Sequence, residues 1–256
     1  MYMGIDIGSS SSKAVILDKN RRNIASAVVN TGTGTQGPDK VVEMALASAS
    51  ISREDIRYCV ATGYGRMLYG KADRQITEIS CHARGVAYLV PEARTIIDIG
   101  GQDAKIIRLD SDGRVENFVM NDKCAAGTGR FIEVMARILD CPIDGLAELS
   151  KQATEEIAIS NTCTVFAESE VISQLASGAK RENVAKGAHH SIAVRVAGLG
   201  GRIGIRPVVA MTGGVALNSE IVSALESQIG YRIVVAENPQ AAGALGTALY
   251  AAEGLL

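Results

Sequence analysis

Two short segments of the chain place an acidic residue, small turn residues and a lysine in the same order. The first runs from Asp6 through a glycine and four serines to Lys13, and the second runs from Asp98 through two glycines, a glutamine and an aspartate to Lys105. Small side chains let backbone N–H groups approach an anion closely, and Mg²⁺ prefers oxygen ligands such as carboxylates and water. The two segments therefore predict two turns that bind phosphate groups and Mg²⁺.

The two segments are copies of one another. Residues 6–18 align without a gap on residues 98–110, at an offset of 92 positions (98 − 6). In each copy an apolar stretch precedes the turn and a second one follows it, which is typical of two buried strands in a hairpin. The predicted strands span residues 4–7, 14–17, 96–99 and 105–109. The duplication predicts two halves of similar fold.

The charged residues of the two turns have distinct predicted roles. Asp6 and Asp98 end their predicted strands at the turns, so we expect both to bind Mg²⁺ through water. Lys13 is the predicted phosphate-binding cation, whereas Lys105 is interpreted as a solvated strand residue. The backbone of both turns is predicted to cradle phosphate groups at Gly8, Ser9, Ser10, Ser11, Ser12, Gly100 and Gly101.

Gln102 and Asp103, in the second turn, are candidates for positioning a water molecule that attacks a bound phosphate group. Positioning and electrostatics supply most of the rate in phosphoryl transfer, so a group that orients this water is required. The sequence does not rank the two side chains. Together with Asp6 and Asp98 they form the predicted catalytic set.

The composition is that of a globular protein with two domains. The chain has 256 residues, of which 47% are hydrophobic and 21% charged, enough for two cores. A net charge of −2 and scattered Lys and Arg argue against nucleic acid or an acidic membrane as a partner. The first predicted strand leaves no room for a leader peptide and no apolar run reaches about 18 residues, so we expect a cytoplasmic protein.

The predicted domains are residues 1–94 and 95–256. Further strands are predicted at residues 24–29, 58–62, 207–211 and 231–236, and helices at 41–49, 79–89, 127–139, 167–175, 181–202 and 219–228. The last helix, from Ala241, is rich in Ala and Gly, which indicates close packing. We expect it to pack back on the first domain.

Two of the five cysteines, Cys124 and Cys163, precede predicted helices. The positive end of a helix dipole stabilises negative charge, which favours a metal-binding thiolate. A lone cysteine between small residues is more often an inert buried thiol, so the spacing alone leaves both interpretations open.

The other cysteines and the histidines receive no metal-binding role. An odd number of cysteines argues against a disulfide framework. Cys59 and Cys141 are expected in the core, Cys81 and His82 are expected to be a satisfied core pair in a helix, and His189 and His190 are expected at the surface.

Three motifs resemble the nucleotide-binding loops of the actin, sugar kinase and Hsp70 superfamily. The two turns resemble its phosphate loops, and residues 211–216, Met-Thr-Gly-Gly-Val-Ala, resemble its adenosine loop. Four more motifs are similar to one branch only: the ATP-dependent activators of 2-hydroxyacyl-CoA dehydratases, of BadF/BadG/BcrA/BcrD type and close kin of the ATPase subunits of benzoyl-CoA reductase. These motifs are residues 63–66 (Gly-Tyr-Gly-Arg), 80–83 (Ser-Cys-His-Ala), 121–131 and 162–170.

The resemblance implies an α/β fold of two duplicated actin-like (ribonuclease H-like) domains with a nucleotide cleft between them. It implies ATP or ADP and Mg²⁺ as ligands, and the residues expected beside the adenosine are Gly213, Gly214 and Gln240. Gly127, Gly129 and Glu133 are candidates to approach the ribose. Gly127 and Gly129 serve equally well to shape the turn beside Cys124.

The resemblance also implies a 4Fe-4S cluster, one per homodimer, held by Cys124 and Cys163 of each chain. One chain offers two thiolates, and a symmetric dimer supplies the four that such a cluster requires. The implied activity is ATP hydrolysis coupled to transfer of one electron. The implied partners are a 2-hydroxyacyl-CoA dehydratase or related cluster enzyme as acceptor and a ferredoxin or flavodoxin as donor.

Three alternatives remain at this stage. The chain is an electron-donating ATPase subunit for a benzoyl-CoA reductase-like or other cluster enzyme, a small-molecule kinase of the same fold, or a non-catalytic nucleotide switch. A kinase needs an acceptor site with a general base, for which the small first half has few candidates. Iron and acid-labile sulfide in anaerobically purified protein separate the last two alternatives from an electron donor.

Overall fold

The computed structural model describes residues 1–254, which form two compact units. Unit 1 comprises Met1–Arg94, Leu109–Glu116 and the C-terminal segment from Ala236, and unit 2 comprises Thr95–Arg108 and Asn117–Val235. The C-terminal segment and the 109–116 hairpin tip group with unit 1.

Unit 1 is built on a five-stranded sheet of order β3-β2-β1-β4-β5. The first two strands are antiparallel and pair Asp6 with Lys13, while β1 and β4 are parallel and pair Asp6 with Thr62. The strands are β1 (Tyr2–Ile7), β2 (Ser12–Leu17), β3 (Asn23–Val29), β4 (Tyr58–Thr62) and β5 (Arg74–Gln75).

Alternation along β1 and β2 gives the first sheet two buried faces. Met3, Ile5 and Ile7 pack with Val41 and other residues of α1 (Gly37–Ala49) in one core cluster. On the other face, Val15 and Leu17 of β2 pack with α8 (Ala242–Glu253) in a second cluster. Because successive side chains of a strand point to opposite faces, burial on both sides explains these nearly continuous apolar runs.

Close backbone contacts seat α8 in unit 1. A Cβ atom at Gly4 would lie 2.2 Å from the Ala244 carbonyl oxygen and from the Ala248 nitrogen. Gly246 meets the backbone of α2 (Glu78–Leu89) in the same way, since its Cβ would lie 1.8 Å from the Cys81 carbonyl oxygen. The Ala and Gly content of the last helix therefore permits the close packing that the sequence predicts.

Unit 2 repeats the topology of unit 1. Its sheet has the order β10-β9-β6-β7-β8, in which β6 pairs antiparallel with β7 and parallel with β9. The register again opposes the acid to the lysine, Asp98 to Lys105, and to a threonine, Thr212. The strands are β6 (Thr95–Ile99), β7 (Ala104–Leu109), β8 (Val115–Asn121), β9 (Val209–Thr212) and β10 (Ile233–Val235). The predicted duplicated α/β fold is confirmed.

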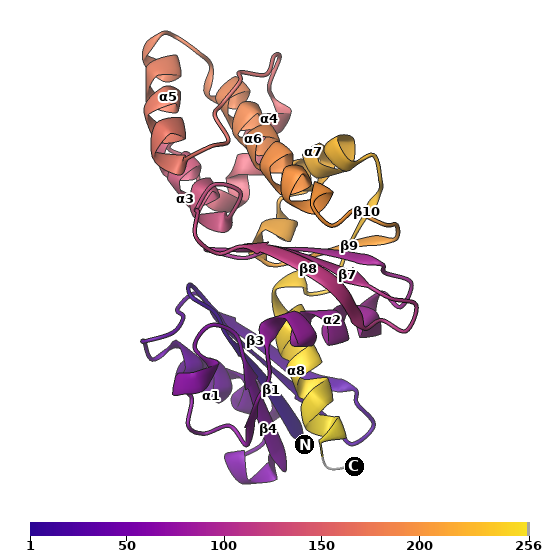
Figure 1. The fold of residues 1–256 in the computed structure, drawn as a ribbon. Coiled ribbons are helices and arrows are strands. Elements are labelled where there is room, and N and C mark those ends of the chain that lie inside the picture. Colours follow the sequence, from indigo (N-terminus) through magenta and orange to yellow (C-terminus); the bar gives the residue numbers. More distant parts are fainter. Residues whose placement is uncertain (255–256) are drawn as a thin grey trace. The chain divides into compact units, whose positions relative to one another are not determined.

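Five helices of unit 2 lie on one side of its sheet (Figure 1). Their buried side chains form one core cluster with Ile97, Ile99 and Ile106 of the sheet. The helices are α3 (Gly129–Ile138), α4 (Leu146–Lys151), α5 (Thr164–Ala176), α6 (Arg181–Gly201) and α7 (Ser219–Ile229). Short 3₁₀ turns complete the described chain: η1 (Arg53–Asp55), η2 (Arg66–Leu68), η3 (Ile143–Gly145), η4 (Gly214–Leu217) and η5 (Pro239–Ala241).

Neither β8 nor α4, nor the two-residue strand β5, is predicted from the sequence. The first four residues of β8 are exposed, so their mixed polar and apolar order carries no burial signal. Only six residues form α4, which is too short for helical periodicity to be evident. Among residues 1–254, no helix is long and apolar enough to cross a membrane.

Candidate functional site

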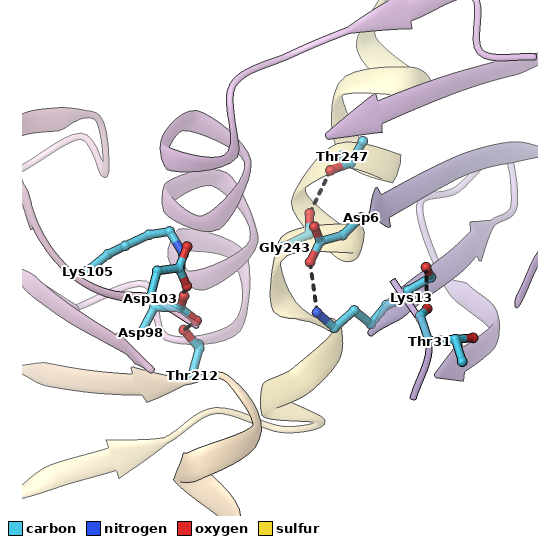
Figure 2. Close-up of polar contacts among 10 residues, drawn as sticks. Asp6, Lys13, Thr31, Asp98, Asp103, Lys105, Thr212, Gly243 and Thr247 are labelled. Carbon is cyan, nitrogen blue, oxygen red and sulfur yellow. Dashed lines mark hydrogen bonds and ion pairs between the residues drawn. The ribbon is translucent and has the colours of Figure 1, made fainter. Parts of the chain in front are cut away.

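The first turn places Lys13 beside Asp6. The Lys13 ammonium lies 3.3 Å from the Asp6 carboxylate, and the two side chains are 15% and 7% exposed (Figure 2). The turn itself is closed by a bond from the Gly8 N–H to the Ser11 carbonyl oxygen, at 3.0 Å. The predicted carboxylate and cation of the first turn therefore lie together, with the ammonium only partly covered.

The second turn holds three charged side chains rather than two. Lys105 lies 3.2 Å from Asp98 and 2.9 Å from Asp103, and its side chain is 4% exposed (Figure 2). The interpretation of Lys105 as a solvated strand residue is wrong. In an antiparallel pair, opposed residues lie on the same face of the sheet, and here Lys105 opposes Asp98. A charge is buried at this position because two carboxylates compensate it.

Thr212 adds a hydrogen bond to the second cluster. Its hydroxyl donates to the Asp98 carboxylate at 2.8 Å, and both residues are buried (Figure 2). The corresponding Thr62 of unit 1 instead donates to the Ile76 carbonyl oxygen, at 2.8 Å. Thr212 occupies the motif resembling an adenosine loop, so strand β9 joins that motif to the carboxylate of the second turn.

The structure distinguishes the two candidates for positioning water. Asp103 is half-buried and held by Lys105, whereas Gln102 is exposed at the tip of the turn. A Cβ atom at Gly100 would lie 2.7 Å from the Asp103 carboxylate, so a larger residue there would displace that side chain. Asp103 thus has a fixed location beside Asp98.

The serines of the first turn differ in exposure. Ser9, Ser10 and Ser11 are half-buried at the tip, and Ser12 is buried. The Ser12 hydroxyl donates to the Thr31 carbonyl oxygen, at 2.9 Å. This hydrogen bond holds the turn against the loop that follows β3 and contains Thr31. The other three serines, Ser9 to Ser11, lie at the tip of the turn.

Gly129 connects the second turn to α3. Its N–H donates to the Gly100 carbonyl oxygen at 2.8 Å, and the Arg130 N–H donates to that of Gly101 at 2.7 Å. Gly127 has a φ of +84°, a conformation that favours glycine, and its Cβ would lie 2.8 Å from Arg195 Cγ. Local backbone structure is therefore sufficient to account for glycine at both positions.

The remaining predicted nucleotide contacts belong to α3, η4 and the turn before it, and η5. Glu133 forms an ion pair with Arg130 at 2.8 Å on the exposed side of α3. Gly213, with a φ of +87°, lies against Ile99, whose carbonyl oxygen would be 2.2 Å from a Cβ there. Gly214 begins η4 in unit 2, and the half-buried Gln240 lies in η5 of unit 1.

Cys124 and Cys163 are brought to one region of unit 2. The Cys124 thiol contacts the carbonyl oxygen of Thr162, the residue before Cys163, at 3.9 Å. Asn121 shapes the Cys124 turn by donating to the carbonyl oxygens of Cys124 at 2.7 Å and of Ala126 at 3.1 Å. Cys163 is the N-cap residue of α5, and both thiols are free and half-buried.

The other cysteines are buried to different extents. Cys59 and Cys81 are buried, and burial raises the pKa of each thiol to about 11. His82 is also buried, next to Cys81 on α2. Cys141 is half-buried and packs against the core of unit 2. The raised pKa values of Cys59 and Cys81 favour the neutral thiol, so these two residues are poor candidates for ligands.

The two adjacent histidines have different environments. The prediction that both lie at the surface is wrong for His189, which is 2% exposed and contacts the Asn218 side chain at 3.2 Å. Burial lowers its pKa to about 4. His190 is more exposed and lies 2.5 Å from Glu156. Adjacent helical residues point in different directions, which accounts for the contrast.

Known proteins resemble this chain over nearly its whole length. The model of the BadF/BadG/BcrA/BcrD ATPase family matches residues 3–251. The activator of lactoyl-CoA dehydratase from Anaerotignum propionicum is 57% identical over 99% of this chain and 98% of its own. The (R)-2-hydroxyglutaryl-CoA dehydratase activating ATPase from Acidaminococcus fermentans is 50% identical, over 97% and 96%.

A solved structure also matches. The activator of the 2-hydroxyisocaproyl-CoA dehydratase from Clostridium difficile, with bound ADPNP, superposes with a TM-score of 0.96 at 54% identity. The match covers 99% of this chain and 95% of the other. The two-unit fold is therefore that of an established structure, one that binds a nucleotide analogue.

Proposed function

The chain belongs to the BadF/BadG/BcrA/BcrD ATPase family, and we propose that it hydrolyses ATP to activate a 2-hydroxyacyl-CoA dehydratase by donating one electron to it. Relatives named as activators of such dehydratases are 57% and 50% identical to it. In this proposal, two copies of the chain share a 4Fe-4S cluster, and a ferredoxin or flavodoxin supplies the electrons.

The proximity of the two cysteine-bearing segments carries this proposal. Cys124 and Cys163 are 39 positions apart in the chain, yet the Cys124 thiol touches the residue preceding Cys163. Both are free and half-buried, so neither is consumed by a disulfide or sealed in a core. Two neighbouring thiols at the surface of one unit are suited to form half of a site shared with a second chain.

The donor set fits an iron–sulfur cluster. Thiolates are soft ligands that select iron–sulfur clusters, zinc and copper(I). Within residues 1–254, no three His, Cys, Asp or Glu side chains gather in a metal-binding group, so four thiolates require two chains. The Thr164 hydroxyl, adjacent to Cys163, is buried and has no hydrogen-bond partner among the described residues. It would be free to donate to a ligand sulfur and so tune the site. When bound, the cluster would supply one-electron chemistry.

The charged side chains of the turns suit a nucleotide with Mg²⁺. We propose that Lys13 binds phosphate, because its ammonium has a single carboxylate partner and is partly exposed. Asp6 and Asp98 would hold hydrated Mg²⁺, which usually keeps several of its waters. The tip residues Ser9 to Ser11 and Gly100 to Gly101 would present backbone N–H groups to the phosphates.

Asp103 is the proposed positioning group for hydrolysis. Lys105 holds its carboxylate beside Asp98, so a water bonded to it has a fixed location relative to the proposed Mg²⁺ site. In the reaction, the water oxygen bonds to the γ-phosphorus, the bond from that phosphorus to the β–γ bridging oxygen breaks, and Asp103 accepts the water proton. Gln102, exposed at the tip, is the second member of the proposed pair.

Backbone bonds support a link between hydrolysis and the cysteine region. The N-terminus of α3 is bonded to both glycines of the second turn through Gly129 and Arg130. The same helix directly follows the Cys124 turn. A change in the turn between ATP-bound and ADP-bound states would therefore act on the Cys124 region without an intermediary. Such a change drives the partner reaction only if ATP and ADP bind the two states with different affinities.

Five serine variants test the proposal. Cys124→Ser and Cys163→Ser should each lose the cluster, whereas Cys59→Ser, Cys81→Ser and Cys141→Ser should retain it. Anaerobically prepared wild-type protein should hold about four irons per dimer, as a four-thiolate cubane requires. Iron and acid-labile sulfide content, with sedimentation of the dimer, provide the measurements.

Two outcomes would contradict the proposal. A full cluster in Cys124→Ser or Cys163→Ser, or a cluster in a monomer, would rule out shared ligation. Protein without iron or sulfide that phosphorylates a small molecule would instead establish a kinase. Exposure to air should bleach the visible absorbance and abolish activation while some ATP hydrolysis remains.

A further inference from the structure

One side of helix α6 carries a stripe of four residues that receives the backbone of both cysteine-bearing segments. Its members are spaced four residues apart, on successive turns of the helix: Asn183, Gly187, Ser191 and Arg195. Residues 153–162, here called the lead-in segment, form the irregular stretch that ends at Cys163. The stripe contacts this segment at three successive points and the Cys124 turn at a fourth.

Asn183 fastens the start of the lead-in segment. Its side-chain oxygen accepts from the backbone N–H groups of Thr154 at 3.0 Å and Glu155 at 3.4 Å, and its side-chain nitrogen donates to the Glu155 carboxylate at 3.0 Å. Asn183 is 1% exposed. A buried amide with three such bonds holds irregular backbone in one place, because leaving any of these groups unpaired is costly.

Gly187 and Ser191 continue the contact toward Cys163. A Cβ atom at Gly187 would lie 1.8 Å from the Ile157 carbonyl oxygen, so the segment lies directly on the helix backbone there. The Ser191 hydroxyl donates to the Ser160 carbonyl oxygen at 3.2 Å, and the Ser160 N–H donates to Glu170 of α5 at 2.8 Å. The segment is thus held on both sides just before Cys163.

Arg195 extends the stripe to the other cysteine. Gly127, three residues after Cys124 and left-handed, packs on the Arg195 side chain, because a Cβ atom at Gly127 would lie 2.8 Å from Arg195 Cγ. One rigid helix therefore sets the positions of the backbone leading to Cys163 and of the backbone leaving Cys124.

We infer that the stripe Asn183–Gly187–Ser191–Arg195 is a positioning template for the two cysteine ligands. This inference rests on the proposed function, because it assigns the stripe to the cluster described above. Ligand-orienting residues that do not touch the metal typically change metal affinity by about 10- to 100-fold when they are altered. The stripe acts in the same way, by fixing the spacing of two thiolates that lie on irregular backbone.

Gly187→Ala tests the inference, with Gly198→Ala as its matched control. Both variants add one methyl group to α6, but a Cβ at Gly198 meets nothing within 4 Å. In iron-free protein, Gly187→Ala should raise amide hydrogen exchange across residues 154–162 by about tenfold or more, as local opening would. In iron-loaded protein, it should release iron to a chelator about tenfold faster or more. Gly198→Ala should match the wild type in both measurements.

Ser191→Ala is the second variant, for use if Gly187→Ala does not fold by circular dichroism. It removes one hydrogen bond and adds no atom, so faster exchange should be confined to residues near Ser160. Unchanged exchange in both variants, or faster exchange with full retention of iron, would overturn the template. An iron-free wild type would refute the proposed function, while the exchange comparison still decides whether the stripe holds the segment.

Discussion

The turns of units 1 and 2 share one backbone frame but hold different charges. Each is closed by the same bond, from Gly8 to Ser11 at 3.0 Å or from Gly100 to Asp103 at 2.9 Å. The first turn has one carboxylate beside one lysine. The second has two carboxylates around a lysine that is 4% exposed, where the corresponding lysine of the first turn is 15% exposed.

The single replacement of Ser11 by Asp103 at the corresponding position accounts for much of this difference. The added carboxylate gives Lys105 a second partner, and burial of its ammonium then becomes tolerable. Lys13, with one partner, remains available to an anion. One copy of the duplicated hairpin is thus suited to bind phosphate and the other to position water, although their strands and register are the same.

Replacing the lysine of each turn should give the largest difference between the units in the free energy of unfolding that is lost. Lys105→Met leaves two carboxylates without their cation, one of them buried, and should lower the free energy of unfolding by about 3–5 kcal/mol. Lys13→Met should lower it by about 1–3 kcal/mol, because only one carboxylate loses its partner. Urea unfolding followed by circular dichroism measures both. Equal losses would show that the two clusters do not differ, and Asp103→Asn added to Lys105→Met should restore part of the stability.

Substitutions at the position where the two turns differ, Ser11 in unit 1 and Asp103 in unit 2, should lower the rate of ATP hydrolysis by different amounts. Asp103→Asn keeps the shape of the side chain but removes the proton acceptor, so kcat for ATP hydrolysis should fall by about 100-fold with a smaller change in nucleotide affinity. Ser11→Ala, at the corresponding position of unit 1, should lower kcat less than about threefold. Steady-state phosphate release checks both. A normal kcat in Asp103→Asn combined with Gln102→Ala would refute the proposed pair.

Acid and alkali should each lower the stability of a different unit. Burial lowers the pKa of His189 in unit 2 to about 4 from its usual 6.5. The unfolded chain binds that proton first, so stability is lost as pH falls from about 6.5 toward 4, by about 2 kcal/mol at pH 5. Burial raises the pKa of Cys59 and Cys81 in unit 1 to about 11 from 9.0. The unfolded thiols ionise first, so stability is lost as pH rises from about 9 toward 11.

Amide hydrogen exchange, measured separately for peptides of each unit, tests whether acid and alkali destabilise different units. Acid should open unit 2 first and alkali should open unit 1 first. His189→Gln, which retains a group able to bond to Asn218, should abolish the acid-side loss due to this residue. Opening of both units at one common pH would argue against independent buried groups.

The corresponding threonines of the two units, Thr62 and Thr212, should give the smallest difference in stability loss when each is replaced. Thr212→Val removes a hydrogen bond to a buried carboxylate and should cost about 1.5–3 kcal/mol. Thr62→Val removes a bond to a backbone carbonyl group and should cost about 0.5–1.5 kcal/mol. Thermal unfolding at neutral pH compares them. A larger effect at Thr62 would show that the bond to Asp98 adds no special stability.

The hairpins were predictable because the duplication repeats their pattern in two places. The register of Asp6 with Lys13 recurs in Asp98 with Lys105, at the same spacing of seven residues. That repeat was a signal that Lys105 is paired. It was overlooked because a lone lysine in a strand is usually exposed, and the compensating effect of Asp103 depends on how the turn folds back.

Other parts of the site depend on contacts between distant residues, which spacing alone does not encode. Thr212 meets Asp98 only because β6 and β9 pair in parallel across 114 positions. Cys124 meets the residue before Cys163 because the lead-in segment lies on α6, a contact that requires glycine at position 187. His189 was expected at the surface with His190, and its burial depends on a contact with Asn218, 29 positions away in the chain.

The seating of α8 against Gly4 has a consequence for the order in which a ribosome-bound chain matures. The strands of the unit 1 sheet are synthesised before most of unit 2, yet one face of that sheet is covered by residues 242–253, which emerge after unit 2. Unit 2 lies wholly between them in the chain, at Thr95–Arg108 and Asn117–Val235. Domains usually complete their folding from the N-terminus during synthesis. Here unit 1 is complete only after unit 2 has been synthesised, so its apolar sheet face stays available to chaperones while unit 2 emerges.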